Sequence, residues 1–263
     1  MASTSIEMDV AHGVAKITLN RPEVLNSFNL DMAQALQRAL DRAGEEDAIR
    51  AVLITGAGRG FCAGQDLKEV LPKEGEPEPN LSDTVAASYN PVILGIRQLE
   101  KPVVAAVNGI AAGAGANLAF ACDLVLAADS ASFVQSFCKL GLVPDSGGTF
   151  ILPRLVGMAR ATALTMLGEK LTAEQARDWG LIYQVHPADE LLEQATSLAN
   201  RLATQPTKGL GFIKRALNAS WTNDLERQLL LEQELQGAAG RTQDYREGVA
   251  AFLEKRKPNY TGK

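Results

Sequence analysis

The sequence predicts an α/β fold in which a largely parallel β-sheet is covered by helices and is followed by a helical C-terminal region. Short apolar runs such as residues 51–56 and 103–107 alternate with segments that carry apolar residues at helical spacing. Strands that are apolar on both faces and separated by helices are typical of parallel sheets. After about Pro153 strand signals nearly vanish. We therefore divide the chain into a core, residues 1–195, and a helical region, residues 196–263.

Strand signals dominate the first half of the chain. Alternating apolar residues at 6–10 and 14–19 flank a three-residue turn and predict a β-hairpin. Asn29 is a suitable N-cap for the next helix, in which apolar residues recur at helical spacing from Met32 to Leu40. Further buried strands are expected at residues 51–56, 103–107 and 123–127.

Helices and one long loop complete the predicted elements. Thr172 begins a short capped helix, and residues 181–185 form a last short strand. Residues 225–240 and 246–258 are amphipathic, and we expect them to pack on the core and on a neighbouring subunit. The segment 72–80 (PKEGEPEPN) is predicted to be a mobile surface loop because it is rich in Pro, Glu and Gly.

Composition is that of an ordinary globular protein, with 46% hydrophobic and 22% charged residues. The net charge of -5 argues against a general affinity for nucleic acid, which requires a basic face. The first ten residues lack the features of a secretory or organelle signal. No apolar run approaches the roughly 20 residues of a membrane span. We therefore expect a cytoplasmic protein that contacts neither membranes nor nucleic acid.

The cysteines do not predict a metal site or a disulfide framework. Cys62, Cys122 and Cys138 are odd in number and include no C-x-x-C pair. We interpret all three as buried, reduced thiols.

Two glycine-rich turns follow predicted strands, at residues 56–60 (GAGRG) and 113–118 (GAGANL). Neither completes the dinucleotide-binding fingerprint, and no Walker A motif occurs. Another use is an oxyanion hole, in which unpaired amides around Ala114 and the positive end of a helix face a ligand oxygen. Residues 61–66 (FCAGQD) would then supply a second amide. Glycines that only permit tight turns and close helix packing remain the alternative for either turn.

Residues 144–149 read PDSGGT and place one carboxylate, Asp145, in an otherwise apolar segment. Pro-Asp-Ser-Gly is a good type I turn sequence, so Asp145 could be an exposed turn residue. The other reading is a base held in a site, partly desolvated by Phe137, Leu142 and Val143, which should raise its pKa.

Several of these segments together resemble the enoyl-CoA hydratase/isomerase (crotonase) family. The resemblance extends over nearly the whole chain in the right order. Its residues are RPEVLNSFN (21–29), GRGFCAGQDL (58–67), KPVVAAVNGIAAGAGANLAFACDLVLA (101–127), the run from KLGLVPDSGGT to LPRLVG (139–157) and EGVAAFLEKRKPNYTG (247–262).

The resemblance implies a core of repeated ββα units, a helical C-terminal trimerisation region, and a homotrimer or hexamer. It also implies acyl-CoA thioester substrates and no separate cofactor, because CoA is part of the substrate. Two backbone amides of the family hold the thioester carbonyl, and these positions are Gln65 and Ala114 here. Contacts with CoA would come from Leu25, Ala63, Gln65, Asp66 and Leu67, and from Phe252 and Lys255 of the C-terminal helix.

Departures from the family pattern indicate the reaction. Hydratases of the family activate water with two glutamates, and those positions hold Asn117 and Phe137 here. Neither side chain can act as acid or base, so water addition by the usual pair is not expected. Asp145 falls where isomerases of the family keep an acid, which implies that it transfers the proton.

Within the family, the chain is most similar to isomerases of ring-epoxidised phenylacetyl-CoA from phenylacetate degradation. Such enzymes form the seven-membered oxepin thioester and also shift 3-enoyl-CoA to 2-enoyl-CoA. The similarity rests on NSFN (26–29), GRGFCAGQDL (58–67), AAGAGA (111–116), KLGLVPDSGGT (139–149), LATQPTKGLGFIK (202–214) and KRKPNYTGK (255–263).

Four other functions stay open at this stage. One is a fatty-acid Δ3,Δ2-enoyl-CoA isomerase. A dehalogenase of the family would need a histidine base, and we interpret His12 and His186, the two histidines, as structural or exposed. A ring-closing naphthoyl-CoA synthase also keeps an aspartate near Asp145, but its other motifs are missing. A CoA- or RNA-binding protein on the same fold is the non-enzymatic alternative, although the sequence has no strongly basic run.

Overall fold

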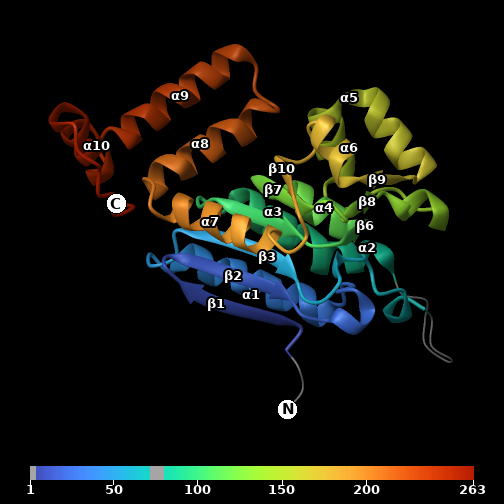
Figure 1. Ribbon diagram of the computed structural model, residues 1–263. Coiled ribbons are helices and arrows are strands. Elements are labelled where there is room, and N and C mark those ends of the chain that lie inside the picture. The colour runs from blue at the N-terminus through green and yellow to red at the C-terminus, as the bar shows by residue number, and fades with distance from the viewer. Residues whose placement is uncertain (1–3, 72–79) are drawn as a thin grey trace.

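The computed structural model describes residues 4–71 and 80–263, which form two β-sheets surrounded by helices (Figure 1). This confirms the predicted α/β class. The larger sheet is parallel except for its first hairpin. Its strands, in spatial order, are β1 (Ile6–Ala11), β2 (Val14–Leu19), β3 (Ala51–Gly56), β5 (Val103–Val107), β7 (Leu124–Ala128) and β10 (Gln184–His186). The loop predicted at 72–80 falls, for residues 72–79, outside the described residues.

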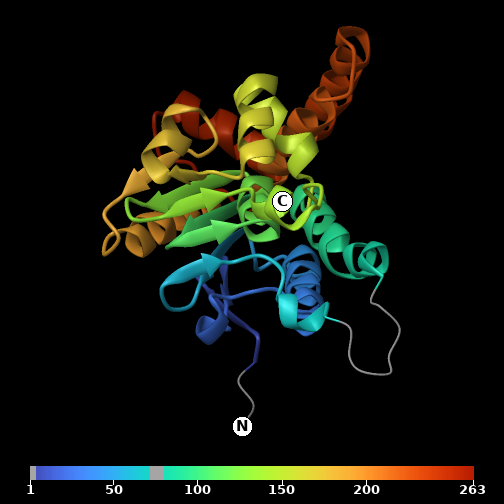
Figure 2. The same cartoon turned by 90° about the vertical axis from the view of Figure 1, so that its right-hand side faces the viewer.

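The core forms where the apolar pattern predicts it. Strands β3 and β5 are buried along nearly their whole length, because helices cover both faces of the sheet. Figure 2 shows α1 (Leu30–Glu45) and α3 (Asn90–Gln98) on one face and α7 (Leu191–Ala203) on the other. Asn29 caps α1 as predicted, since its side-chain oxygen accepts a hydrogen bond from the Met32 amide at 2.9 Å.

Helices make up most of the remaining chain. The others are α2 (Leu81–Thr84), α4 (Ala114–Ala121), α5 (Gly148–Leu167), α6 (Ala173–Asp178), α8 (Thr207–Ser220), α9 (Leu225–Ala239) and α10 (Gln243–Glu254). Short 3₁₀ turns occur at Pro22–Val24, Leu67–Glu69 and Ser136–Leu140, and a π-helical turn at Val85–Tyr89. Thr172 caps α6 in a reciprocal capping box with Gln175, as its sequence predicts.

A second, smaller sheet was not predicted, because three-residue strands carry too short a pattern to recognise. Its order is β4 (Gly60–Cys62), β6 (Ile110–Ala112), β8 (Ser132–Val134) and β9 (Lys170–Thr172). The strand predicted at 181–185 is also displaced, since β10 spans Gln184–His186. The small sheet matters for function because the parallel pair β4 and β6 brings the ends of both glycine-rich segments to one edge.

The C-terminal helices leave the core after α8. Helix α7 packs on the large sheet, and the predicted boundary between residues 195 and 196 lies inside this helix. Helix α8 is held to the core by Lys214, which is 8% exposed and lies 2.8 Å from the Asp123 carboxylate. Lys214 also donates to the Ile96 carbonyl at 2.7 Å. Helices α9 and α10 extend away from both sheets (Figures 1 and 2).

Helix α5 is the one helix in the described ranges that could cross a bilayer by length and composition alone. This corrects the expectation that no apolar stretch approaches that length, because the 20 residues of α5 include only Arg154 and Arg160 as charges. However, Gly157 has φ of 76° and ψ of 162° and breaks the helix. Each part then has about half the residues that a spanning helix needs.

We predict that Lys214→Met lowers the free energy of unfolding by about 3 kcal/mol, because it leaves the Asp123 carboxylate half-buried without its closest cation. Urea unfolding measures the change. Lys208→Met on the exposed face of the same helix is the matched control and should change stability little. Equal stability of the two variants would contradict the role of Lys214 as an anchor of α8.

Candidate functional site

Two glycine-rich segments meet where β4 and β6 end. Gly113, with φ of 52°, turns the chain from β6 into α4. A Cβ on Gly115 would lie 2.3 Å from the Cys62 carbonyl oxygen, and one on Gly64 would lie 2.8 Å from the Ala112 carbonyl oxygen. Larger residues do not fit at these distances. The glycines therefore permit close packing, and this packing brings the segment after β4 against the start of α4.

Gln65 and Ala114 lie on these two segments, and no described residue accepts a hydrogen bond from either backbone amide. The Phe28 amide donates to the Gly64 carbonyl at 2.7 Å, and the Asp66 amide donates to the Phe28 carbonyl at 2.8 Å. Because a trans peptide group is planar, the Gln65 N–H points opposite to the Gly64 carbonyl, away from Phe28. Ala114 begins α4, where an N–H has no partner within the helix. A Cβ on Gly64 would lie 3.7 Å from the Ala114 nitrogen, so the segments are adjacent.

Asp145 begins a tight left-handed turn that leads into α5. The Gly148 amide donates to the Asp145 carbonyl at 2.9 Å, and the Asn117 side chain donates to the same oxygen at 2.8 Å. Ser146 and Gly147 have φ of 51° and 75°. A type I turn has negative φ at both central residues, so the type I reading of this sequence is wrong. The left-handed turn of a non-glycine residue is a strained conformation, and Asn117 on α4 helps to hold it.

The Asp145 carboxyl is half-buried and accepts a hydrogen bond from the Ser146 hydroxyl at 2.9 Å. Burial raises its pKa above the ordinary value, although the Ser146 hydrogen bond opposes the change. The direction agrees with the sequence prediction, but part of the expected apolar wall is absent. Leu142 is 42% exposed and Val143 80% exposed, because the segment after the 3₁₀ turn runs along the surface. Phe137, in contrast, is buried.

Asn117 and Phe137 make structural contacts, and neither side chain has a group that could act as an acid or a base. Asn117 is 1% exposed, and its side-chain oxygen accepts from the Gln135 amide at 2.9 Å while its amide holds the Asp145 turn. The Phe137 ring lies under Gly113, where an added Cβ would be 3.6 Å from the ring edge. Neither side chain carries a proton-transfer group, so Asp145 is the acid of these three positions.

Sequence reasoning missed Tyr89, which borders the same site. Its hydroxyl donates to the Gln65 side-chain oxygen at 2.6 Å, and the side chain is 3% exposed. Burial raises its pKa strongly, and the nearby Asp145 carboxylate raises it further. The phenol therefore stays neutral at physiological pH. The sequence gave no signal for the contact with Gln65, because Tyr89 lies in a helical segment without a recognisable motif.

The other predicted CoA contacts divide into two groups. Leu25, Ala63, Asp66 and Leu67 are close to the site, since the Ala63 amide donates to the Leu25 carbonyl at 3.0 Å. Asp66 caps the following 3₁₀ turn and also forms an ion pair with Arg21 at 2.8 Å. Its carboxylate is therefore already engaged.

Phe252 and Lys255 do not join this group within one chain. Both belong to the end of α10, which lies at the opposite side of Figure 1 from α2 and the small sheet. Phe252 is 83% exposed. The fold of one chain therefore separates these two residues from the other predicted CoA contacts.

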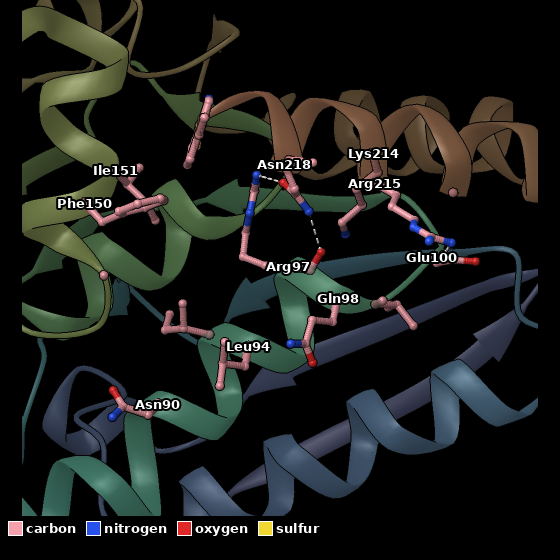
Figure 3. A pocket seen from close by; sticks show the side chains of 16 residues that line it. Asn90, Leu94, Arg97, Gln98, Glu100, Phe150, Ile151, Lys214, Arg215 and Asn218 are labelled. Carbon is pink, nitrogen blue, oxygen red and sulfur yellow. Dashed lines mark hydrogen bonds and ion pairs between the residues drawn. The ribbon is translucent and has the colours of Figure 1, made fainter. Parts of the chain in front are cut away.

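An apolar cavity of about 770 Å³ lies behind the Asp145 turn, between α3, the start of α5 and α8 (Figure 3). Gly147 and Ile151 line it from the turn side, and Trp221 closes it near α8. Its charged groups are paired. Arg97 and Lys214 lie 3.8 and 2.8 Å from the Asp123 carboxylate, and Arg215 lies 4.0 Å from Glu100. Sequence analysis did not identify this cavity, since its walls come from three segments distant in the chain.

The cysteines are free thiols. Cys62 and Cys122 are buried, and burial raises the pKa of each thiol to about 12. Cys138 is half-buried, in contrast to the prediction that all three are buried, because it lies within the 3₁₀ turn Ser136–Leu140, next to the exposed Lys139. In the described part of the chain, no three His, Cys, Asp or Glu side chains gather as a metal site.

Comparison with known proteins places this arrangement in a family. The family model described as enoyl-CoA hydratase/isomerase matches residues 9–263. The chain belongs to the enoyl-CoA hydratase/isomerase family. It is 54% identical to the 1,2-epoxyphenylacetyl-CoA isomerase of Escherichia coli K12, with 97% of each chain covered. It is 37% identical to the trans-2-decenoyl-(acyl-carrier-protein) isomerase of Streptococcus mutans, again with 97% of each covered.

Solved structures of the family have the same fold. The crystal structure of an enoyl-CoA hydratase from Bacillus anthracis superimposes with a TM-score of 0.92 at 38% identity, covering 98% of this chain and 100% of that one. The family assignment made from the sequence is confirmed, as is the expectation that the chain is an enzyme. Relatives at this level bear the names of both isomerases and hydratases, so the reaction must be argued from the residues of the site.

We predict that Asp145→Asn stabilises the folded chain at neutral pH. The folded-state pKa of Asp145 lies above its unfolded value of 3.8. Ionisation of the carboxyl therefore lowers the free energy of unfolding as the pH rises from the unfolded pKa through the folded-state pKa. The cost is absent below the unfolded pKa. Urea unfolding near pH 7.5 should therefore show a larger gain for the variant than unfolding near pH 4. A gain that is larger at the acidic pH would contradict the burial of this carboxylate.

Proposed function

We propose that this protein is a cofactor-independent acyl-CoA isomerase with Asp145 as its acid–base residue. One observation carries the proposal: of positions 117, 137 and 145, which surround the glycine turn, only Asp145 can transfer a proton. A single carboxyl suits a reaction that removes a proton and returns it elsewhere on the same molecule. Water addition would require a second group to orient and deprotonate the water.

The two backbone amides would stabilise the negative charge that forms when the proton is removed. A thioester loses its C2 proton only if negative charge on the carbonyl oxygen is stabilised. The amides of Gln65 and Ala114, one beside a helix start, would donate to that oxygen. Removal of one such donor typically costs about 3 kcal/mol of transition-state stabilisation. Asp145 then takes the proton from C2, the double bond moves, and the same carboxyl returns the proton at C4.

The substrate proposal follows the relative with 54% identity. We assign the conversion of 2-(1,2-epoxy-1,2-dihydrophenyl)acetyl-CoA to the oxepin thioester, together with the shift of 3-enoyl-CoA to 2-enoyl-CoA, as a step of aerobic phenylacetate catabolism. Both reactions rearrange bonds without adding atoms. The raised pKa of Asp145 supports the proposal, because a carboxyl that titrates closer to neutrality accepts and returns a proton more readily.

The assembly and location belong to the same proposal. Helices α9 and α10 expose large apolar residues, including Leu225, Leu230 and Phe252, and this supports a homotrimer or hexamer formed through the C-terminal region. Such an assembly would allow Phe252 and Lys255 to contact CoA bound to a second copy. We place the enzyme in the cytoplasm, with no cofactor besides the CoA of the substrate and no nucleic-acid or membrane partner.

Asp145→Asn should keep CoA-ester binding and lose at least about 10²-fold in turnover, because the amide cannot transfer a proton. Chromatography with mass detection would follow the ring epoxide ester and a 3-enoyl-CoA in parallel. Asp129→Asn on the surface is the control. Wild-type turnover by Asp145→Asn would reject the assignment. Activity on the 3-enoyl ester alone would leave a fatty-acid Δ3,Δ2-enoyl-CoA isomerase, the second candidate.

The absence of a glutamate pair predicts slow hydration. Wild-type enzyme incubated with 2-enoyl-CoA should form hydroxyacyl-CoA at less than about a hundredth of its isomerisation rate, because Asn117 and Phe137 cannot deprotonate water. A gain of one water in the product mass measures hydration. Rapid hydration would show that another group activates water and that the role of Asp145 needs revision.

A further inference from the structure

Tyr89 contacts both partners of the backbone bridge that directs the Gln65 amide. Phe28 and Gln65 form an isolated parallel bridge, and the hydrogen bond from Phe28 to Gly64 sets the direction of the Gln65 N–H. The Tyr89 ring packs edge-to-face against Phe28, with centroids 5.8 Å apart and an angle of 84°. Its hydroxyl donates to the Gln65 side-chain oxygen at 2.6 Å. One side chain therefore spans the bridge.

The backbone around Tyr89 is adapted to this contact. Tyr89 ends the π-helical turn Val85–Tyr89, directly before α3. A π-turn adds a residue to a helical turn and redirects the side chains that follow, and such turns are frequent at functional sites. The Gln37 side chain donates to the Ala87 and Ser88 carbonyls at 3.0 and 3.2 Å, so α1 holds the turn from outside.

The isolated bridge needs such support because it is short. Two backbone hydrogen bonds join Phe28 to residues 64 and 66, whereas a regular strand pair continues over several residues. The peptide that precedes Gln65 also follows Gly64, which has φ of 89° and wide conformational freedom. Fixing the Gln65 side chain limits the rotation that this glycine would otherwise allow.

We infer that Tyr89 is a positioning residue, whose hydroxyl fixes Gln65 and thereby the direction of the backbone amide that stabilises the thioester oxyanion. The inference rests on the proposed function for its chemistry. Tyr89 acts through Gln65, and its neutral hydroxyl remains a donor over the working pH range. The Asp145 carboxylate raises the pKa of the phenol in addition to burial, which keeps the hydroxyl protonated.

Tyr89→Phe keeps the ring packed on Phe28 and removes the hydrogen bond. We expect kcat for a 3-enoyl-CoA to fall about tenfold while KM changes less than about twofold, because a misdirected oxyanion donor weakens the transition state more than the ground state. Thermal unfolding should confirm that the variant is folded. Tyr183→Phe removes the hydroxyl of a tyrosine that is 51% exposed and is the matched control.

A double-mutant cycle isolates the hydrogen bond. Gln65→Met removes the acceptor oxygen and leaves the backbone amide in place. If the hydroxyl acts through this bond, the double variant should be about as active as the less active of the two single variants. Losses that multiply, or wild-type kcat in Tyr89→Phe, would overturn the inference.

Infrared spectroscopy tests the position of the amide without turnover. The carbonyl stretch of carbonyl-¹³C hexanoyl-CoA should shift less to low frequency on binding to Tyr89→Phe than on binding to wild type, because the carbonyl is less polarised. An equal shift in both proteins would refute the positioning role. If wild type does not isomerise 3-enoyl-CoA, the proposed function fails, and the infrared comparison still decides the role of Tyr89.

Discussion

The close packing of the segment after β4 against the start of α4 is the contact on which the site depends. It exists because Gly64 and Gly115 have no side chains where the backbones approach, with only 2.3 Å available for a Cβ at Gly115. This contact places the backbone amides of Gln65 and Ala114 on adjacent segments. The small sheet supports the arrangement, since pairing of β4 with β6 sets where both segments leave it.

Helix α4 also connects this contact to the turn that carries Asp145. Asn117 lies one turn after Ala114 and holds the Asp145 carbonyl at 2.8 Å, while Gln135 holds Asn117 from behind. An amide can bridge two partners in this way because it has both donors and an acceptor. The Asn117 side chain thus holds the backbone of the turn that carries Asp145.

The site retains features that oppose stability. The Asp145 carboxyl is half-buried, which raises its pKa, and Ser146 has a positive φ. Both raise the free energy of the folded state, and both are common where a reactive group must be held in place. The surrounding core of buried strands and helices absorbs this cost. In contrast, α9 and α10 expose large apolar side chains, so these side chains gain little stabilisation from burial within their own chain.

The sequence alone determined the α/β class, the hairpin, the parallel core, the cap at Asn29 and the family, because periodicity, capping residues and motifs are local properties. It also singled out Asp145, Gln65 and Ala114 from their motifs. Only the tertiary structure revealed the small sheet, the left-handed turn at Asp145, the support by Asn117 and the contact of Tyr89 with Gln65. These features depend on segments that are distant in the chain, and no local pattern records which side chains meet when those segments pack.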